Sequence, residues 1–424
     1  MSKRLILSLI SLGLISFLSV LIETSLNVTF EYLTKTYEID IKTASLLTSM
    51  FLLALTLIMP TSSFLLQRFN TKKLFIFTNF LFLLSLLVCA SFNNFYILVL
   101  ARFLQGIAAG IALPLMFNIV IIKASKKYFG FLIGFCVFLV ATAPGFGPIY
   151  GGFIMKYFEF RDIFIFLIPF LVFALILGIF NIDDLSSKAS FDYKEYFLIL
   201  GLIVSLVCSV DNIGFFIVFL LLLYLLIKLK SNILKVAFNY RFFCSSLMVF
   251  LMQFFALSYS LILPNYLISV LDYDSFNASK VMFLGSISAA LLAPISGFLS
   301  NIIGSFKLAF TGVILIIFSN ILFLYLDENL LNFSISYLVY AFAQGMSMSV
   351  IIAYSINLSS DKTNANTYIN TFQQCFGVLG VLVISKVFND NYLIGFKNSI
   401  YVILSLAFLQ LILIYFAFKN KCKV

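Results

Sequence analysis

Two ionisable side chains lie inside long apolar stretches of the sequence, where the burial of a charge costs free energy. Glu23 is the only carboxylate well inside such a stretch, and Arg102 lies well inside another. Burial favours the neutral form of a carboxyl and a nearby cation favours the charged form, so Glu23 could bind and release a proton near neutral pH. Arg102 would favour the deprotonated form if the two side chains approach one another. This pair predicts proton handling inside a membrane.

Each ionisable candidate also has a plainer structural interpretation. Glu23 would lie in the outer headgroup region if the first apolar stretch left the membrane early. Arg102, whose burial in a bilayer costs at least about 2.5 kcal/mol, could hydrogen-bond backbone carbonyls and lock helices together. Asp211, at the outer end of a short apolar stretch, is a third candidate for a proton or substrate role, although a lone carboxylate there is usually a solvated turn residue.

Side-chain amides are the other polar groups that recur inside the apolar stretches. Sparse amides can orient a ligand that is held mostly by apolar area. A cavity lined by some of the 53 phenylalanines would suit hydrophobic or cationic compounds. The amides expected to contact a substrate are Asn27, Gln105, Gln253, Asn265, Gln344, Gln373 and Gln374.

The composition requires that these groups be carried by membrane-spanning helices. Hydrophobic residues make up 62% of the 424 residues and charged residues only 10%, and the mean hydropathy is +1.12. Because a bilayer offers no water to satisfy backbone groups, long apolar runs must be helical. The expected fold class is all-α, a polytopic membrane protein without a sizeable soluble domain.

The same composition excludes several classes of function. The sequence has no histidine, no acidic cluster within an apolar stretch, and six cysteines without a CxxC pair, so no membrane enzyme, metal site or cofactor is expected. No repeated channel filter motif is visible. The net charge of +10 comes from basic residues placed singly or in pairs, without a patch that would bind nucleic acid. A transporter of small molecules remains.

Apolar runs bounded by charged residues, Asn or Gly predict fourteen membrane spans. The seventh and eighth are the weakest, because about 16 residues barely cover a hydrocarbon core of roughly 30 Å, and this pair could be a re-entrant hairpin. The predicted spans lie near residues 5–33, 45–67, 74–92, 95–122, 130–155, 163–182, 196–211, 214–230, 243–271, 281–303, 307–326, 333–356, 367–388 and 399–418.

The distribution of basic residues predicts the orientation of these spans. With the N-terminus inside, most of the 27 Lys and Arg residues fall in inner loops, as the positive-inside rule requires. Both termini are therefore expected in the cytoplasm, and the protein in the inner (cytoplasmic) membrane. The first apolar run is too long for a signal peptide and lacks a small-x-small cleavage site, so we interpret it as a retained span.

The sequence contains an internal repeat. Arg102-Phe-Leu-Gln-Gly106 and Ala341-Phe-Ala-Gln-Gly345 share one pattern, and residues 63–73 align with residues 297–307 at nearly the same offset. Two six-helix halves related in this way are typical of transporters that rock around a central site. We expect an N-terminal half at 1–182, an inserted hairpin with its linkers at 183–241, and a C-terminal half at 242–424. The hairpin itself, at 196–230, should lie outside the twelve-helix core and face lipid.

Four motifs carry a family resemblance. Residues 143–152, APGFGPIYGG, differ from the pattern GxxxGPxxGG only at the first Gly, and residues 98–110, LVLARFLQGIAAG, match lxxxRxxqGxxaa. Residues 21–28, LIETSLNV, place an acid before Thr and Asn, and residues 370–380, NTFQQCFGVLG, give an NxxxQxxG-like segment. Together these resemble the major facilitator superfamily, specifically its fourteen-span drug:proton antiporter branch.

The resemblance implies roles for individual residues. Arg102 is associated with proton transfer in the family, and Arg68 belongs to a conformational loop motif. The glycines and proline of the antiporter signature, Gly145, Gly147, Pro148, Gly151 and Gly152, would let helices pack closely and kink, although an ordinary small-residue packing face would look similar. The amides of residues 370–380 suit either interhelical hydrogen bonds or a polar cavity wall.

The loop between the second and third spans departs from the family. Its expected GxxxDRxGRK reads SFLLQRFNTK over residues 63–72, so only Arg68 and the pair Lys72 and Lys73 remain of its charges. The charge relay that this loop usually makes with a neighbouring span is therefore in doubt.

The resemblance predicts a function and leaves one alternative. We expect a proton-coupled secondary transporter that exports small amphipathic or cationic compounds, working as a monomer with a small-molecule substrate, protons and membrane lipid as its partners. A dedicated exporter of one endogenous metabolite, such as a siderophore or an amino-acid derivative, is the alternative. Uptake is possible on the fold alone, but the antiporter signature argues for efflux.

Overall fold

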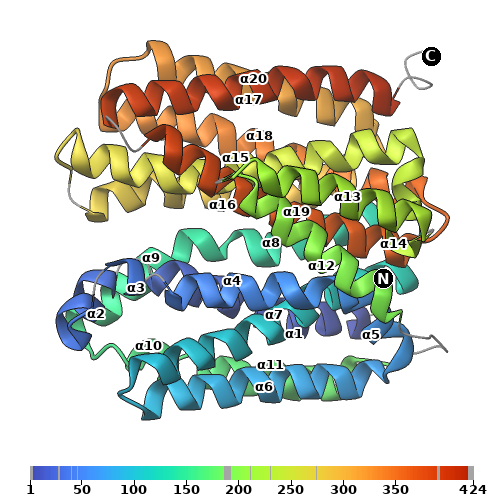
Figure 1. The fold of residues 1–424 in the computed structure, drawn as a ribbon, viewed down its shortest axis with the longest axis horizontal. Helices are drawn as coiled ribbons and strands as arrows, with labels where there is room; N and C mark the ends of the chain where they lie inside the picture. The colour runs from blue at the N-terminus through green and yellow to red at the C-terminus, as the bar shows by residue number, and fades with distance from the viewer. Residues whose placement is uncertain are drawn as a thin grey trace. The chain divides into compact units, whose positions relative to one another are not determined.

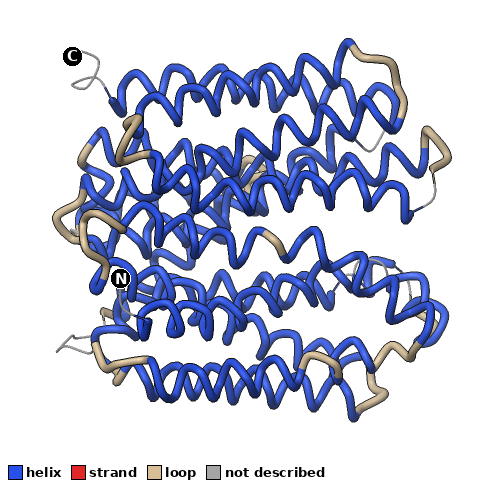
Figure 2. The backbone as a smooth tube through the Cα atoms, turned by 180° about the vertical axis from the view of Figure 1, so that it is seen from behind, coloured by secondary structure: helices blue, strands red, loops and turns tan. Residues whose placement is uncertain are grey.

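Helices make up nearly all of the computed structural model (Figures 1 and 2), and no strand occurs in the part of the chain that it describes. The expected all-α class is confirmed. The described residues are 3–26, 29–39, 41–44, 46–185, 192–210, 212–229, 231–273, 275–388 and 392–418.

The chain divides into two compact units. Unit 1 comprises residues 1–124 and 139–191, and unit 2 comprises residues 125–138 and 192–424, so the division falls within one helix, α8. In unit 1, α1 packs on α7, α9 and α11, while α4 and α6 pack on α7. Its helices are α1 (Lys3–Leu26), α2 (Phe30–Tyr37), α3 (Ile41–Ala44), α4 (Leu46–Ile58), α5 (Ser62–Arg68), α6 (Thr71–Ser91), α7 (Phe95–Lys123), the end of α8 (Phe129–Ala141), α9 (Ala143–Tyr157), α10 (Asp162–Ile165) and α11 (Ile168–Asn181).

Unit 2 is built around α15 and α18. Helix α15 packs on α18, α19 and α20, and α18 also packs on α16 and α17. Besides the first part of α8, the helices of this unit are α12 (Tyr193–Cys208), α13 (Gly214–Lys228), α14 (Asn232–Lys235), α15 (Tyr240–Ser269), α16 (Ser275–Leu299), α17 (Ser305–Tyr325), α18 (Leu330–Leu358), α19 (Lys362–Phe388) and α20 (Tyr392–Phe418).

Twelve segments of the described chain are long and apolar enough to cross a membrane, or thirteen if α13 and residues 232–238 form one span bent by 87°. The protein is therefore a multi-pass membrane protein. The sequence predicts fourteen spans, and the shortfall lies in the hairpin. Helices α12 and α13 have 16 and 15 residues, which at 1.5 Å per residue is about 24 Å, less than the roughly 30 Å core.

The exposure of the hairpin fits an outer position in unit 2. Helix α13 buries only Leu226, whereas large apolar side chains such as Ile217 and Tyr224 are exposed. Helix α12 packs on α13 and touches α19. The buried Glu195 accepts hydrogen bonds from the Ser231 hydroxyl and from the backbone N–H of Ile233 at 2.9 Å, and so ties α12 to α14.

Asparagine residues begin several of the spans. The side chains of Asn70, Asn94, Asn239 and Asn329 cap α6, α7, α15 and α18 by accepting hydrogen bonds from backbone N–H groups of the first turn. Asn70 stands where the loop motif of the resembled family has glycine, so one of the residues that depart from this motif is the one that caps α6.

Candidate functional site

Arg102 lies fully buried where α7 packs on α4. Its Nε donates a hydrogen bond to the backbone carbonyl of Leu47 at 3.2 Å, and its guanidinium carbon lies 4.4 Å from the ring centre of Phe51. Gly106, one turn further along α7, allows this approach, since a Cβ there would come within 2.3 Å of the Phe51 carbonyl oxygen. The predicted carbonyl contact of the arginine is therefore present.

A short polar chain extends from Arg102. Its Nη1 donates to the side-chain oxygen of Gln105, and the Gln105 amide contacts the sulfur of Cys89 on α6 at 3.9 Å. The Nη2 atom of Arg102 is buried without a hydrogen-bond partner among the described residues. A buried guanidinium nitrogen without a partner is costly, so this donor is available to a carboxylate, a water or a ligand.

Glu23 lies near the end of α1 and is partly buried. It interacts electrostatically with Arg102, but its carboxyl group forms no hydrogen bond or ion pair with any residue that the structure describes. The two charges are therefore close enough to influence one another without being locked together. Such a carboxyl group can exchange its proton without first breaking a direct contact.

Residues 143–152, the segment that resembles the antiporter signature, pack beside Glu23. A Cβ at Gly147 on α9 would come within 1.8 Å of the Thr24 hydroxyl oxygen and 2.9 Å of the Leu21 carbonyl oxygen. This glycine therefore sets the distance between α9 and the segment of α1 that carries Glu23. The span is also interrupted here, because α8 ends at Ala141 and α9 begins at Ala143, just before Pro144.

The remaining motif residues of unit 1 differ in their surroundings. Gly145 and Gly151 are buried, and Pro148 lies inside α9. Gly152 is exposed, and a Cβ there would meet no described atom within 4 Å. Close helix packing therefore does not require this glycine. Arg68 is exposed at the end of α5.

Two of the predicted amides meet in unit 2. The Gln373 amide of α19 donates to the Gln253 side-chain oxygen of α15 at 3.1 Å, and both side chains are partly buried. Gly377, one turn further along α19, lies close to the same glutamine, since a Cβ there would be 3.1 Å from the Gln253 Cγ atom. The α15–α19 contact thus presents a paired amide group.

The other predicted site residues are not brought together. Gln344 and Gln374 are partly buried and make no hydrogen bond within the described chain. Asn265 is exposed and donates to the Leu261 carbonyl of its own helix at 2.7 Å. Asn27 and Asp211 lie outside the described residues.

Sequence reasoning missed a buried polar cluster in unit 2. The Tyr259 hydroxyl donates to the Asn320 side-chain oxygen at 2.8 Å, and its ring lies 4.3 Å from that of Tyr340, whose own hydroxyl is buried without a partner in the described chain. Tyrosine rather than phenylalanine in the middle of an apolar helix was the available signal, because its hydroxyl needs a partner when buried.

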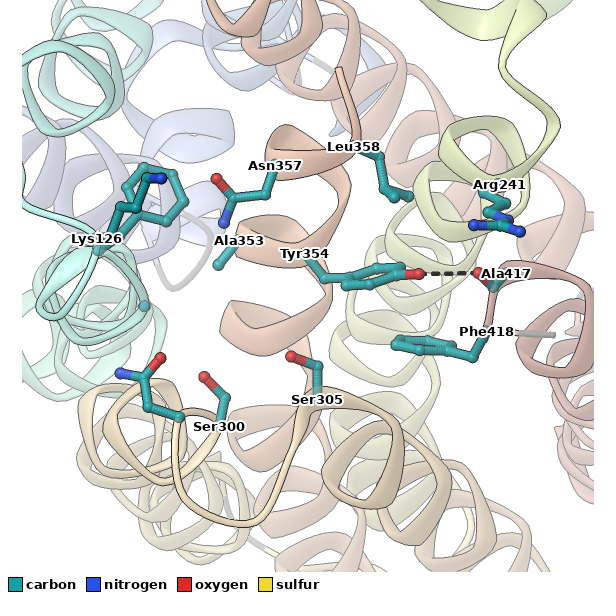
Figure 3. A pocket seen from close by; sticks show the side chains of 13 residues that line it. Lys126, Arg241, Ser300, Ser305, Ala353, Tyr354, Asn357, Leu358, Ala417 and Phe418 are labelled. Atoms are coloured by element: carbon teal, nitrogen blue, oxygen red, sulfur yellow. Dashed lines mark hydrogen bonds between the residues drawn. The ribbon is translucent and has the colours of Figure 1, made fainter. Parts of the chain in front are cut away.

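The helix ends of unit 2 surround a cavity of about 350 Å³ (Figure 3). Its walls come from the start of α8, the start of α15, the turn between α16 and α17, and the ends of α18 and α20. Lys126 and Arg241 supply its charges, and Ser300, Ser305 and Asn357 supply neutral polar groups.

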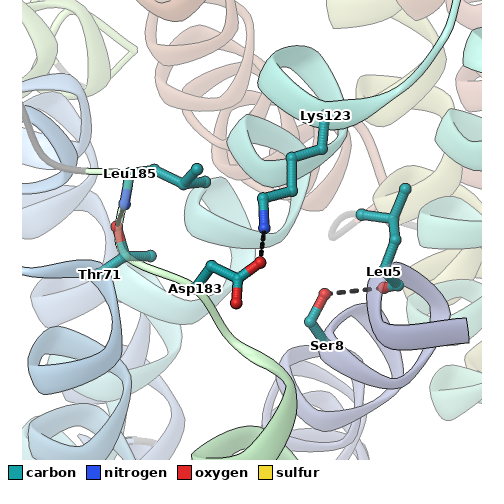
Figure 4. Close-up of polar contacts among 6 residues, drawn as sticks. All are labelled: Leu5, Ser8, Thr71, Lys123, Asp183 and Leu185. Atoms are coloured by element: carbon teal, nitrogen blue, oxygen red, sulfur yellow. Dashed lines mark hydrogen bonds and ion pairs between the residues drawn. The ribbon is translucent and has the colours of Figure 1, made fainter. Parts of the chain in front are cut away.

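At the helix ends of unit 1, by contrast, the charged and polar groups pair with one another (Figure 4). Lys123, the last residue of α7, forms an ion pair with Asp183. Thr71, the first residue of α6, donates its N–H to Asp184 at 3.0 Å and accepts from the N–H of Leu185 at 2.9 Å. The hydrogen bond from Lys123, together with its charge, holds the pKa of Asp183 below its ordinary value.

Comparisons with known proteins identify relatives over most of the chain. The family model described as Major Facilitator Superfamily matches residues 12–382. The uncharacterized MFS-type transporter YhcA of Bacillus subtilis is 23% identical over 88% of this chain and 75% of its own. The lincomycin resistance protein LmrB of the same organism is 28% identical over 74% of this chain and 71% of its own.

A solved structure has the same fold. The human organic anion transporter MFSD10 (TETRAN) superposes with a TM-score of 0.69, covering 98% of this chain and 100% of its own at 14% sequence identity.

Within the described chain, no three His, Cys, Asp or Glu side chains gather where they could hold a metal ion.

Proposed function

The chain belongs to the major facilitator superfamily and is a secondary transporter rather than an enzyme, and on this premise we propose that it exports small amphipathic or cationic compounds in exchange for protons. The name of LmrB, a lincomycin resistance protein, supports export of a drug-like compound. The proton dependence rests on unit 1.

The observation that carries the proposal is the geometry of Glu23. Its carboxyl group is partly buried, unpaired within the described residues, and within electrostatic reach of a buried arginine. Protonation from the outer side would remove its attraction to Arg102, and release of the proton to the inner side would restore it. Because the α1–α9 distance is set by Gly147 beside it, a change at Glu23 would reach the antiporter signature directly.

The proposed substrate site combines amides with apolar area. In unit 2, the pair Gln253 and Gln373 orients the ligand, and Gln344 and Gln374 are further proposed contacts. Gln105 and Asn27, in unit 1, stay predicted substrate contacts. Asn265 is the weakest member of the predicted set, because its amide is satisfied by its own helix on an exposed face.

The proposed setting is the inner membrane, with both termini in the cytoplasm and the protein acting as a monomer. The bias of basic residues toward one set of loops supports this orientation. We assign α12 and α13 to an inserted pair of short membrane helices at the edge of unit 2, since their exposed apolar surface needs lipid. This pair would complete fourteen spans.

The test is substrate-dependent proton flux by the purified protein in liposomes that carry an internal pH indicator. A lipophilic cation, a neutral amphipathic drug and a panel of metabolites are added in turn. We expect several chemically unrelated compounds to move protons in the direction opposite to their own. A flux restricted to one metabolite would favour the dedicated exporter, and transport without any proton movement would refute the proposal.

A further inference from the structure

The cavity at the helix ends of unit 2 has the chemistry of an anion site. Lys126 and Arg241 are the charged residues of its wall, and none of its lining residues is acidic. Lys362 lies beside it, with its ammonium 3.1 Å from the Asn357 side-chain oxygen and 5.4 Å from the ring centre of Phe129, and both of these residues line the cavity. Two cations therefore line the cavity and a third flanks it, without a carboxylate among the lining residues.

The cations of this cavity are not neutralised elsewhere in the described chain. Arg241 donates its Nε to the Tyr240 hydroxyl at 3.1 Å, and neither Arg241 nor Lys126 forms an ion pair with a described residue. Asp361, the nearest acid in the sequence to Leu358, has its carboxylate oxygens occupied by the backbone and side-chain N–H groups of Asn364. The sequence after Phe418 adds three lysines and no acidic side chain.

Neutral donors complete the lining. Ser300 and Ser305 lie at the turn between α16 and α17, and Ser305 opens α17, a helix whose N-terminus has no side-chain cap. Hydroxyl groups and free backbone N–H groups at a helix start favour phosphate oxygens. The Tyr354 hydroxyl already donates to the Ala417 carbonyl at 2.9 Å, which satisfies one acceptor at the end of α20.

The position of the cavity indicates the source of the anion. Its walls are the ends of membrane helices, and its lining also includes Phe129, Leu358 and Phe418. The positive-inside rule assigns these helix ends to the cytoplasmic face, where the membrane carries anionic lipid. In the view of Figure 3, Lys126 and Arg241 lie on opposite sides of the end of α18. Cations on both sides of one helix end suit an extended headgroup better than one small anion.

We propose that this basic cavity binds the phosphate-bearing headgroup of an anionic phospholipid from the cytoplasmic leaflet. Arg241 and Lys126 neutralise the headgroup, Ser300 and Ser305 donate to its oxygens, and the apolar lining contacts its glycerol and first methylenes. The site is independent of proton coupling, since it uses neither Glu23 nor Arg102.

The test uses the intact purified protein in detergent, with phosphatidylglycerol binding measured by native mass spectrometry. The double variant Lys126→Gln, Arg241→Gln should bind phosphatidylglycerol about 25-fold more weakly, at roughly fivefold per removed charge. The matched control, Lys72→Gln with Lys73→Gln, removes two basic residues from the first turn of α6 in unit 1 and should bind as the unaltered protein does. Equal losses in both double variants would indicate diffuse surface charge and overturn the proposal.

A further variant controls for misfolding, and further ligands identify what the cavity binds. Ser305→Asp places a carboxylate in the cavity at the start of α17, where it is compatible with the helix, and it should weaken phosphatidylglycerol binding while leaving the thermal unfolding temperature unchanged. Phosphatidylcholine should bind equally to all variants. If inorganic phosphate binds the unaltered protein, is lost in the double variant Lys126→Gln, Arg241→Gln, and phosphatidylglycerol does not bind, the site takes a free anion and the lipid assignment is wrong.

Discussion

Helices α7 and α18 carry the same short pattern, one in each unit, and they pack in the same way. Gly106 and Gly345 occupy matching places, and a Cβ at either would come within about 2.3 Å of a neighbouring backbone oxygen, that of Phe51 or that of Ala289. Four residues before these glycines the repeats differ, because unit 1 has the buried Arg102 and unit 2 has Ala341. The repeat thus conserves close packing and changes charge.

The helix ends show the reverse arrangement. Unit 1 neutralises Lys123 with its own Asp183, whereas the corresponding end of unit 2 leaves Arg241 and Lys126 facing a cavity. Unit 1 therefore keeps its unsatisfied charge inside the membrane, and unit 2 keeps it at the surface. This division is consistent with the proposal that the first unit handles protons, and that the second unit binds neutral groups of a substrate and, at its edge, lipid.

In the comparison of the two repeats, the largest effect is expected from removing Arg102, the charge that unit 1 has and unit 2 lacks. Arg102→Gln takes the donor from the Leu47 carbonyl and from Gln105, and deprives Glu23 of its cation, so proton-coupled transport should fall at least about tenfold. Gln344→Ala, in the matching helix of unit 2, should reduce transport only a few-fold. The measurement is drug uptake into everted vesicles, normalised to folded protein.

A conservative variant separates the two interpretations of the arginine. Arg102→Lys keeps a charge but cannot reproduce the planar fork that reaches Leu47 and Gln105 while stacking on Phe51. If charge near Glu23 matters, Arg102→Lys should transport better than Arg102→Gln. Equal transport by both variants, with equal loss of folded protein, would leave only the packing role.

The next effect concerns the glycine that positions Glu23. Gly147→Ala would place a methyl group 1.8 Å from the Thr24 hydroxyl oxygen, an overlap that costs about 1–3 kcal/mol even after relaxation. We expect a severalfold loss of transport, partly restored by Thr24→Ala. The control is Gly152→Ala, which meets no described atom and should be silent. Similar losses of transport in Gly147→Ala and Gly152→Ala would contradict the claim that the contact of residues 143–152 with α1 matters for transport.

These contacts show what the sequence could and could not predict. The motifs around Arg102 and Gly147 predicted a buried arginine and a close helix contact, and both are present because those residue types have few alternatives in a membrane. The partners Leu47, Phe51 and Cys89 follow from tertiary packing that no local pattern encodes. Asn265 was expected beside substrate because it is polar in an apolar run, yet its amide turns back to its own helix.

The ends of the hairpin helices and the contacts at the helix ends of unit 1 could not be predicted from the sequence, for different reasons. Hydropathy detects apolar character but not the residue at which a helix ends. It therefore predicts α12 and α13 as spans, although each helix is short. The partners of Asp183 and Asp184 could not be predicted, because their contacts with Lys123 and Thr71 join segments far apart in the sequence.

In unit 2, the amide pair should show coupling of moderate size. Gln253→Ala and Gln373→Ala each leave the other amide without its partner, so each should weaken substrate binding a few-fold. The double variant should lose less than the sum, with an interaction energy of about 0.5–2 kcal/mol. Binding is measured by quenching of a fluorescent substrate. Strict additivity would mean that the 3.1 Å contact has no part in binding.

The smallest effect is expected at the unit 1 helix ends. Lys123 lowers the pKa of Asp183, so the stability from this pair is present above the unfolded-state pKa of about 3.9 and is lost as the pH falls through the folded pKa. Since Asp183 is half exposed, Asp183→Asn should cost less than about 1 kcal/mol at pH 7. The difference in thermal unfolding temperature between the two proteins should disappear once the pH falls below the lowered folded-state pKa of Asp183. A difference that persists there would assign the effect to something other than the ion pair.

The most direct test of the division between the units is substrate-induced proton release from everted vesicles containing Glu23→Gln. The control is Glu38→Gln, which neutralises an exposed carboxylate of the same unit. Glu23→Gln should abolish proton release and proton-driven accumulation, and weaken binding of cationic substrates more than neutral ones, while Glu38→Gln behaves as the unaltered protein. Proton release at the unaltered rate from Glu23→Gln would contradict the account and move the search to Asp211.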